Sequence, residues 1–228
     1  MKRTIHDFSW MTQESQEVFW RYQKDMSEQA KEEAIFMRKL LGLETVVGLQ
    51  ILDVGCGVGY HAAVFTDLGA DVTGIDVSDY CLNLAKERCK GTSAIFHRMK
   101  AKDSLWDGAF DAAIAIRHTL GFMPYEELIE HLSKIALALK PGAKLLLSVP
   151  FSLEKGRKHY PVHSWSEENG VFTLVDKYLD EENRKWECCV ILDTNKDEVV
   201  EFHEQQRLYS TAETVEALHL SGFASVEI

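Results

Sequence analysis

Hydrophobic and polar positions follow two different patterns along the chain. In the first half, short apolar runs alternate with segments of helical periodicity. The expected strands are 50–54, 71–76, 94–97, 109–116 and 143–149, and the expected helices are 59–68, 78–89 and 124–139. This alternation predicts an α/β fold, with a mainly parallel sheet covered by helices on both faces. Residues 12–41 carry apolar side chains at near-helical spacing, which predicts one or two helices before the sheet.

The pattern changes after Pro150. The runs 171–179, 186–193 and 198–208 have the character of strands and are separated by turn-rich segments. They predict an antiparallel β insertion after the fifth strand. A helix ending at Leu220 and a last strand follow. The expected parts are an N-terminal helical lid (1–48), a sheet core (49–150), an antiparallel β cap (151–209), and a C-terminal helix and strand of the core (210–228).

Composition narrows the classes of function. The 228 residues include 36 acidic and 25 basic side chains, which gives a net charge of −11. This balance argues against nucleic-acid binding, which needs clustered Lys and Arg. No apolar stretch is long enough to span a bilayer and no signal peptide is evident, so we expect a cytoplasmic protein without a membrane partner. Five cysteines without a C-x-x-C pair predict reduced thiols, and no metal cluster is expected.

Residues 51–59 are the most informative segment. An apolar run passes directly into three alternating glycines, Gly55, Gly57 and Gly59. Glycine tolerates positive φ and lets a ligand lie against the backbone, where the N–H groups that open the next helix face it. Asp76 ends the second apolar run, and a carboxylate in that position can accept hydrogen bonds from two ribose hydroxyls. Together these features predict a nucleoside site.

Two cofactors compete for this site. Residues 57–62 also satisfy the G-x-G-x-x-A fingerprint of dinucleotide-binding proteins, with Asp76 near the expected distance. Asp53 argues against a dinucleotide, because a carboxylate beside the turn repels a pyrophosphate and attracts a cationic ligand. S-adenosylmethionine has such a cationic end. An NAD-dependent oxidoreductase remains the alternative.

Four blocks in this order and spacing resemble the class I S-adenosylmethionine-dependent methyltransferases. The blocks are Asp53-x-Gly55-x-Gly57-x-Gly59, Asp76, residues 110–114 and residues 139–147. With the β insertion included, the chain is most similar to bacterial small-molecule members such as sugar N,N-dimethyltransferases. The resemblance implies transfer of a methyl group from S-adenosylmethionine to N or O of a small molecule. A non-catalytic protein that binds the same cofactor is a second alternative.

The resemblance also implies the positions of the site residues. The cofactor-binding set is Asp53, Gly55, Cys56, Gly57, Gly59, Asp76, Val77, Met99, Ala101 and Arg117. Relatives usually hold adenine with an Asp after the third strand, whereas this chain offers backbone groups near Ala101 with Met99 packing on the ring. Trp10, Trp20 and Tyr22 either close over the cofactor as part of the lid or simply pack between helices.

Acceptor chemistry requires a group that receives a proton, because an amine must be neutral and a hydroxyl must lose its proton to attack. His118, after the fourth strand, is the first candidate for this catalytic role, followed by Tyr209 and His163. His118 also fits a simple loop histidine. Relatives normally continue into a seventh strand, which leaves an open sheet edge here. Either the sequence is truncated, a strand of the cap fills the gap, or a second copy supplies the pairing in a homodimer.

Overall fold

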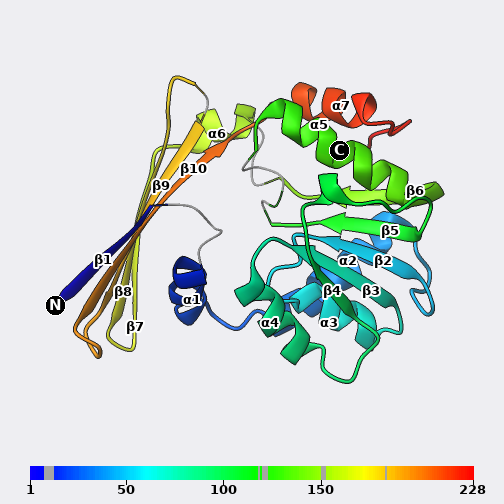
Figure 1. The fold of residues 1–228 in the computed structure, drawn as a ribbon. Helices are drawn as coiled ribbons and strands as arrows, with labels where there is room; N and C mark the ends of the chain where they lie inside the picture. The colour runs from blue at the N-terminus through cyan, green and yellow to red at the C-terminus, as the bar shows by residue number, and fades with distance from the viewer. Residues whose placement is uncertain (8–12, 118, 120–122, 150–152, 183) are drawn as a thin grey trace. The chain divides into compact units, whose positions relative to one another are not determined.

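The computed structural model describes residues 1–7, 13–117, 119, 123–149, 153–182 and 184–228. The chain divides into two compact units. The α/β unit comprises residues 11–120, 125–149 and 215–228, and the β unit comprises residues 1–10, 121–124 and 150–214. Figure 1 labels the elements of both units. No helix in the described ranges is both long enough and apolar enough to cross a bilayer.

The α/β unit contains a sheet in which every pairing is parallel, in the order β4-β3-β2-β5-β6. Its strands are β2 (Gln50–Val54), β3 (Asp71–Asp76), β4 (Ile95–Arg98), β5 (Phe110–Ala115) and β6 (Leu139–Leu147). The helical elements are α1 (Gln13–Arg21), α2 (Ser27–Leu41), α3 (Tyr60–Asp67), α4 (Asp79–Arg88), η1 (Ala101–Asp103) and α5 (Tyr125–Ala138). Helix α7 (Thr211–Leu220) begins in the β unit and ends in this one. The mainly parallel α/β fold expected from the sequence is confirmed.

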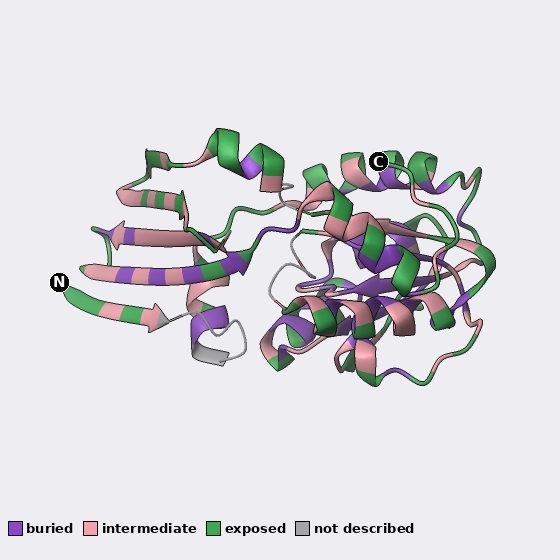
Figure 2. Ribbon diagram, turned by 90° about the horizontal axis from the view of Figure 1, so that it is seen from above, coloured by how far each residue is buried: buried purple, intermediate pink, exposed green. Residues whose placement is uncertain are grey.

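The core of this unit lies between the sheet and the helices α2 and α3. Met37 of α2, Phe65 of α3 and Ile51 of β2 belong to one buried cluster, which also contains Val72 and Ile114 from the neighbouring strands. Helix α5 covers the other face of the sheet (Figure 1). Figure 2 shows how strongly the buried residues concentrate in the central strands. Strands buried on both faces are nearly continuous apolar runs, which explains why the sequence revealed them.

The β unit is built around a second sheet in the order β1-β10-β9-β8-β7. Its elements are β1 (Lys2–Asp7), α6 (Leu153–His159), β7 (Val162–Glu168), β8 (Val171–Leu179), β9 (Arg184–Asp193) and β10 (Glu198–Arg207). Strands β7 to β10 are antiparallel, whereas β1 pairs in parallel with β10. One face buries Val200, Phe202 and Ile191, and the other exposes Trp165 and Leu174. The antiparallel insertion after strand five is confirmed.

Four details of the sequence prediction are wrong. Residues 2–7 form a strand, although only helices were expected before the core, and β7 was not foreseen. Both strands are rich in polar residues and lie at the edges of the sheet, so they lack the apolar alternation that identifies a strand. Residues 223–228 form no strand, because they pair with no neighbouring strand among the described residues. Strand β6 begins at Leu139 rather than Ala143.

Close packing at the turn after β2 leaves no room for a side chain at Gly59. A Cβ atom on Gly59 would lie 2.8 Å from the Ala85 Cβ of α4, at a φ of +79°. Gly108 also has positive φ, +56°, but a Cβ there meets nothing within 4 Å. We expect Gly59→Ala to lower the free energy of unfolding by about 1–3 kcal/mol more than Gly108→Ala, because it adds overpacking to backbone strain. Urea denaturation measures the difference, and equal losses would contradict the packing argument.

Candidate active site

The turn between β2 and α3 is anchored to the end of β3. Gly55, Gly57 and Gly59 all have positive φ, of +68°, +53° and +79°. The backbone N–H groups of Gly55 and Cys56 both donate to the Ile75 carbonyl, at 2.8 and 3.0 Å. These bonds fix the turn at the carboxyl edge of the parallel sheet, where ligands bind in open α/β folds.

The three glycines of the turn serve different purposes. A Cβ on Gly55 would lie 2.2 Å from Thr119 Cγ2, and one on Gly59 would collide with Ala85. Among the described residues, a Cβ on Gly57 would meet nothing closer than a ring carbon of Trp20, at 3.9 Å. Gly55 and Gly59 are therefore required by packing within the protein. Gly57 leaves open space over the backbone, as expected where a ligand approaches.

Asp76 connects the turn to the start of α4. Its Oδ2 accepts a hydrogen bond from the Gly57 N–H and its Oδ1 accepts one from the Ser78 N–H, both at 2.9 Å. Burial raises the pKa of this carboxyl, and the backbone bonds from Ser78 and Gly57 act in the opposite direction. Each carboxylate oxygen has a second lone pair, so the arrangement still leaves room for hydroxyl donors.

Asp53 is a buried acid at the end of β2. Its exposed fraction is 3%, and its Oδ2 has no hydrogen-bond partner in the part of the chain that the structure describes. Burial, and then the charge of Asp76, raise the pKa of Asp53 to about 7. Buried charges in proteins are normally paired. The site is therefore short of positive charge, and a cationic ligand group would supply it.

Cys56 lies inside the turn and behaves as an apolar packing group. It is buried, and burial raises the pKa of its thiol well above the usual value. A Cβ on Gly74 of β3 would lie 2.9 Å from its sulfur. The thiol is therefore protonated at neutral pH. Whether Cys56 contacts a cofactor stays a prediction.

The residues expected at the adenine gather at the end of β3. The Met99 N–H donates to the Asp76 carbonyl at 3.0 Å, and Arg98 Nε donates to the Val77 carbonyl at 3.1 Å. Ala101 is buried and opens the short helix η1. The structure thus brings Val77 and Met99 beside the carboxylate assigned to the ribose.

Arg117 makes contacts that the sequence did not reveal. Its Nη2 donates to both carboxylate oxygens of Glu33 on α2, at 2.7 and 2.9 Å, and Glu33 also contacts His61 Nε2 at 2.7 Å. Partial burial raises the pKa of Glu33, but hydrogen bonds from His61 and Arg117 outweigh it, and the net shift is downward. Burial lowers the pKa of His61. Arg117 therefore ties the end of β5 to α2, and its predicted contact with the cofactor is not tested.

Helix α1 places an aromatic ring beside the glycine turn. Trp20 Nε1 donates to Gln16 Oε1 at 3.1 Å and lies 3.2 Å from Cys81 Sγ on α4. The same ring is the nearest group to the open space at Gly57. Trp20 is therefore held by packing and also borders the space expected for the ligand. Trp10 lies outside the described residues.

The three catalytic candidates differ in what the structure says of them. His118 lies outside the described residues. Tyr209 is buried and its hydroxyl donates to the Met123 carbonyl, whereas His163 is 73% exposed on β7, with Nδ1 at 2.6 Å from Asp176 Oδ1. Both belong to the β unit, and the glycine turn belongs to the α/β unit. Their catalytic role stays a prediction.

Comparison with known proteins shows what the chain is similar to. Residues 51–142 match a family described as "Methyltransferase domain". This segment, which is less than half of the chain, is similar to that domain family. It is 34% identical over 110 residues to the demethylmenaquinone methyltransferase of Tropheryma whipplei (strain Twist), covering 48% of this chain and 44% of that protein. It is 32% identical over 122 residues to the ubiquinone biosynthesis O-methyltransferase of Bradyrhizobium sp. (strain ORS 278), covering 50% and 44%. The chain thus spans less than half the length of these relatives.

Solved structures extend the similarity beyond this domain. The CcbJ methyltransferase from Streptomyces caelestis superposes with a TM-score of 0.72 at 18% identity, covering 85% of this chain and 78% of that one. The S-adenosylmethionine-bound amino pentose methyltransferase CalS10 from Micromonospora echinaspora gives 0.70 at 20% identity, covering 95% and 91%. The fold is that of the class I S-adenosylmethionine-dependent methyltransferases. The resemblance seen in the sequence is confirmed.

The residues present fit S-adenosylmethionine as the cofactor. The unpartnered oxygen of Asp53 is suited to the cationic methionyl end, and the space above Gly57 admits the ligand to the backbone. Asp76 lies one hydrogen bond from the same turn and offers its free lone pairs to the ribose. The carboxylates of Asp53 and Asp76 beside the turn disfavour a pyrophosphate, because they would repel its negative charge.

The raised pKa of Asp53 predicts a pH dependence. Between pH 3.8 and about 7 the folded protein holds a proton on Asp53 that the unfolded chain has released. The stability that this proton contributes is therefore complete below pH 3.8 and is lost as the pH rises through about 7. We expect Asp53→Asn to flatten the decline of unfolding free energy between about pH 4 and 7, in urea titrations at several pH values. An unchanged slope would contradict the assigned environment of Asp53.

Proposed function

We propose that this protein transfers a methyl group from S-adenosylmethionine to a nitrogen or oxygen of a small molecule. The observation that carries the proposal is an open glycine turn beside the buried Asp53 carboxylate, one oxygen of which has no partner among the described residues, inside a segment that matches the methyltransferase family. The sulfonium supplies a methyl group that is already activated for displacement. The protein therefore has to hold the cofactor, align the acceptor and exclude water.

Each part of the cofactor has a binding group in the α/β unit. Asp53 faces the cationic methionyl end, the backbone at Gly57 lies along the ligand, and Asp76 accepts the ribose hydroxyls. Val77 and Met99 line the adenine, with backbone groups near Ala101. Trp20 of α1 closes over the turn, in keeping with the lid role proposed for the N-terminal helices.

The acceptor is a small molecule whose nucleophilic atom gives up a proton. His118 is the proposed proton acceptor, with Tyr209 and His163 as further candidates. The β unit, which contains residues 151–209, is the proposed acceptor cap. The names of three similar proteins support a small acceptor, since one is a demethylmenaquinone methyltransferase, one a ubiquinone biosynthesis O-methyltransferase and one an amino pentose methyltransferase.

The net charge and the state of the cysteines support two further proposals, on partners and on location. A net charge of −11 opposes a nucleic-acid substrate. All five cysteines are free thiols, which suits the reducing cytoplasm.

Strand β6 ends the sheet order of the α/β unit and presents an edge with which a second copy can pair in a homodimer.

Asp76 provides the sharpest test of the cofactor site. We expect Asp76→Ala to weaken S-adenosylmethionine binding by a factor of about ten or more, because a charge-assisted hydrogen bond contributes about 1.5–3 kcal/mol. The matched control is Asp79→Ala, which removes an exposed carboxylate three residues away that pairs with Arg98 at 3.3 Å. Calorimetric titration with S-adenosylhomocysteine measures both variants. Equal affinities would overturn the assignment of Asp76.

Gly57 tests access to the backbone. Gly57→Val fills the open space above the turn, so we expect cofactor binding to be lost while the protein remains folded by circular dichroism. Normal binding by a folded Gly57→Val protein would mean that the glycine is only structural.

Turnover separates an enzyme from a non-catalytic binding protein. We expect release of S-adenosylhomocysteine in multiple turnovers when small amines and hydroxyl compounds are screened with labelled S-adenosylmethionine. A protein that binds the cofactor tightly but transfers no methyl group to any acceptor in the screen would favour the non-catalytic alternative.

A further inference from the structure

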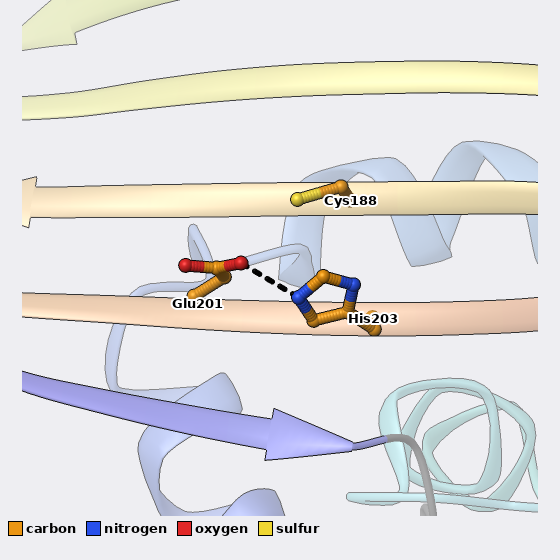
Figure 3. A group of neighbouring side chains, drawn as sticks. All are labelled: Cys188, Glu201 and His203. Carbon is orange, nitrogen blue, oxygen red and sulfur yellow. Dashed lines mark hydrogen bonds and ion pairs between the residues drawn. The ribbon is translucent and has the colours of Figure 1, made fainter.

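The antiparallel sheet carries three metal-ligand side chains that methyl transfer does not use. Cys188 lies on β9, and Glu201 and His203 lie on β10 (Figure 3). The Cys188 sulfur, one Glu201 carboxylate oxygen and one His203 ring nitrogen all lie within 4.8 Å of one another. We propose that this cluster binds one divalent transition-metal ion of the zinc class.

Strand pairing, rather than the flexibility of the side chains, brings these three residues together. His203 and Cys188 are direct cross-strand partners in the antiparallel ladder. Glu201 precedes His203 by two residues, so both side chains leave the same face of the sheet. Cross-strand partners hold their Cβ atoms about 4.5–5.5 Å apart. A metal ion therefore needs only side-chain rotations and no movement of the backbone.

The donor set suits zinc. A thiolate, an imidazole nitrogen and a carboxylate oxygen are the three side-chain ligands that Zn²⁺ takes, and three protein ligands leave a fourth position for water. His203 Nε2 and Glu201 Oε1 are 2.7 Å apart. In a tetrahedral site with bonds of about 2.0–2.1 Å, the same two atoms would be roughly 3.3 Å apart. The two atoms thus need to separate by only about 0.6 Å when a metal replaces the hydrogen bond between them.

Neighbouring groups orient the ligands and add negative charge. The second oxygen of Glu201 is paired with Arg3 on β1, which leaves the first oxygen directed at His203. Asp176 of β8 is the register partner of Cys188 on its other side and is bonded to His163. Ion pairing alone accounts for Arg3, Glu201 and His203. It gives no role to the sulfur that lies with them.

A bound ion would join two strands of this sheet, and the Arg3–Glu201 pair would link it to a third. Cys188 belongs to β9 and the other two ligands to β10, while the Arg3 pair extends the connection to β1. Metal binding is therefore coupled to the stability of the β unit, because an ion that binds only the folded state stabilises it.

Cobalt is the spectroscopic probe for this site. The full chain is stripped of metal with a chelator and titrated with Co²⁺. We expect one Co²⁺ per chain, with a sulfur-to-cobalt charge-transfer absorption that Zn²⁺ abolishes by displacement. Cys188→Ser should lose the absorption, and Glu201→Gln and His203→Gln should each bind Zn²⁺ at least ten-fold more weakly.

The adjacent cysteine supplies the matched control. Cys189 follows Cys188 in β9, is also half-buried, and leaves the opposite face of the sheet. Cys189→Ser should keep both the absorption and the rise in melting temperature that Zn²⁺ gives to the unmodified protein. The proposal is overturned if the protein binds no Co²⁺, if Cys189→Ser loses the absorption, or if Glu201→Gln and His203→Gln bind Zn²⁺ normally. Should Cys188→Ser fail to fold, the two other ligand variants decide.

Discussion

The candidate active site depends on the carboxylate of Asp76, which holds two loops at once. One oxygen accepts the N–H of Gly57 in the turn after β2, and the other accepts the N–H of Ser78 before α4. A buried charge is tolerated only where such donors replace water. Because the backbone carbonyl of the same residue accepts the Met99 N–H, three segments distant in sequence share this one anchor at the edge of the sheet.

Around this anchor, packing and binding use different parts of one short turn. Neighbouring side chains fill the space beside Gly55 and Gly59, so these glycines allow Thr119 and α4 to approach closely. Gly57 is free of such a neighbour. Close to it lie two buried acids, and the charge of Asp76 adds to burial in raising the pKa of Asp53, so the pair carries an electrostatic cost. A cationic ligand relieves this cost, which links the shape of the turn to the charge of the cofactor.

The α/β core and the cofactor turn could be predicted from the sequence, because a buried strand is a short apolar run and a glycine turn is a short run of alternating glycines. The edge strands β1 and β7 are polar and have no apolar pattern that predicts them. Residues 223–228 have the sequence pattern of a strand but pair with no strand among the described residues. The contact of Arg117 with Glu33 and the cluster of Cys188 with His203 depend on tertiary packing and strand register. Neither can be read from spacing along the chain.

The parallel pairing of β1 with β10 bears on how the molecule is made. Lys2 lies opposite Glu198, so β1 leaves the ribosome well before the strand with which it pairs. The parallel strands β2 to β6 are synthesised in between. Contacts this distant in sequence form slowly, because a long loop must close before they contribute stability. During synthesis β1 therefore has no strand partner until β10 has been made. Its charged residues Lys2, Arg3 and Asp7 are of the kind that protects an unpaired strand from aggregation.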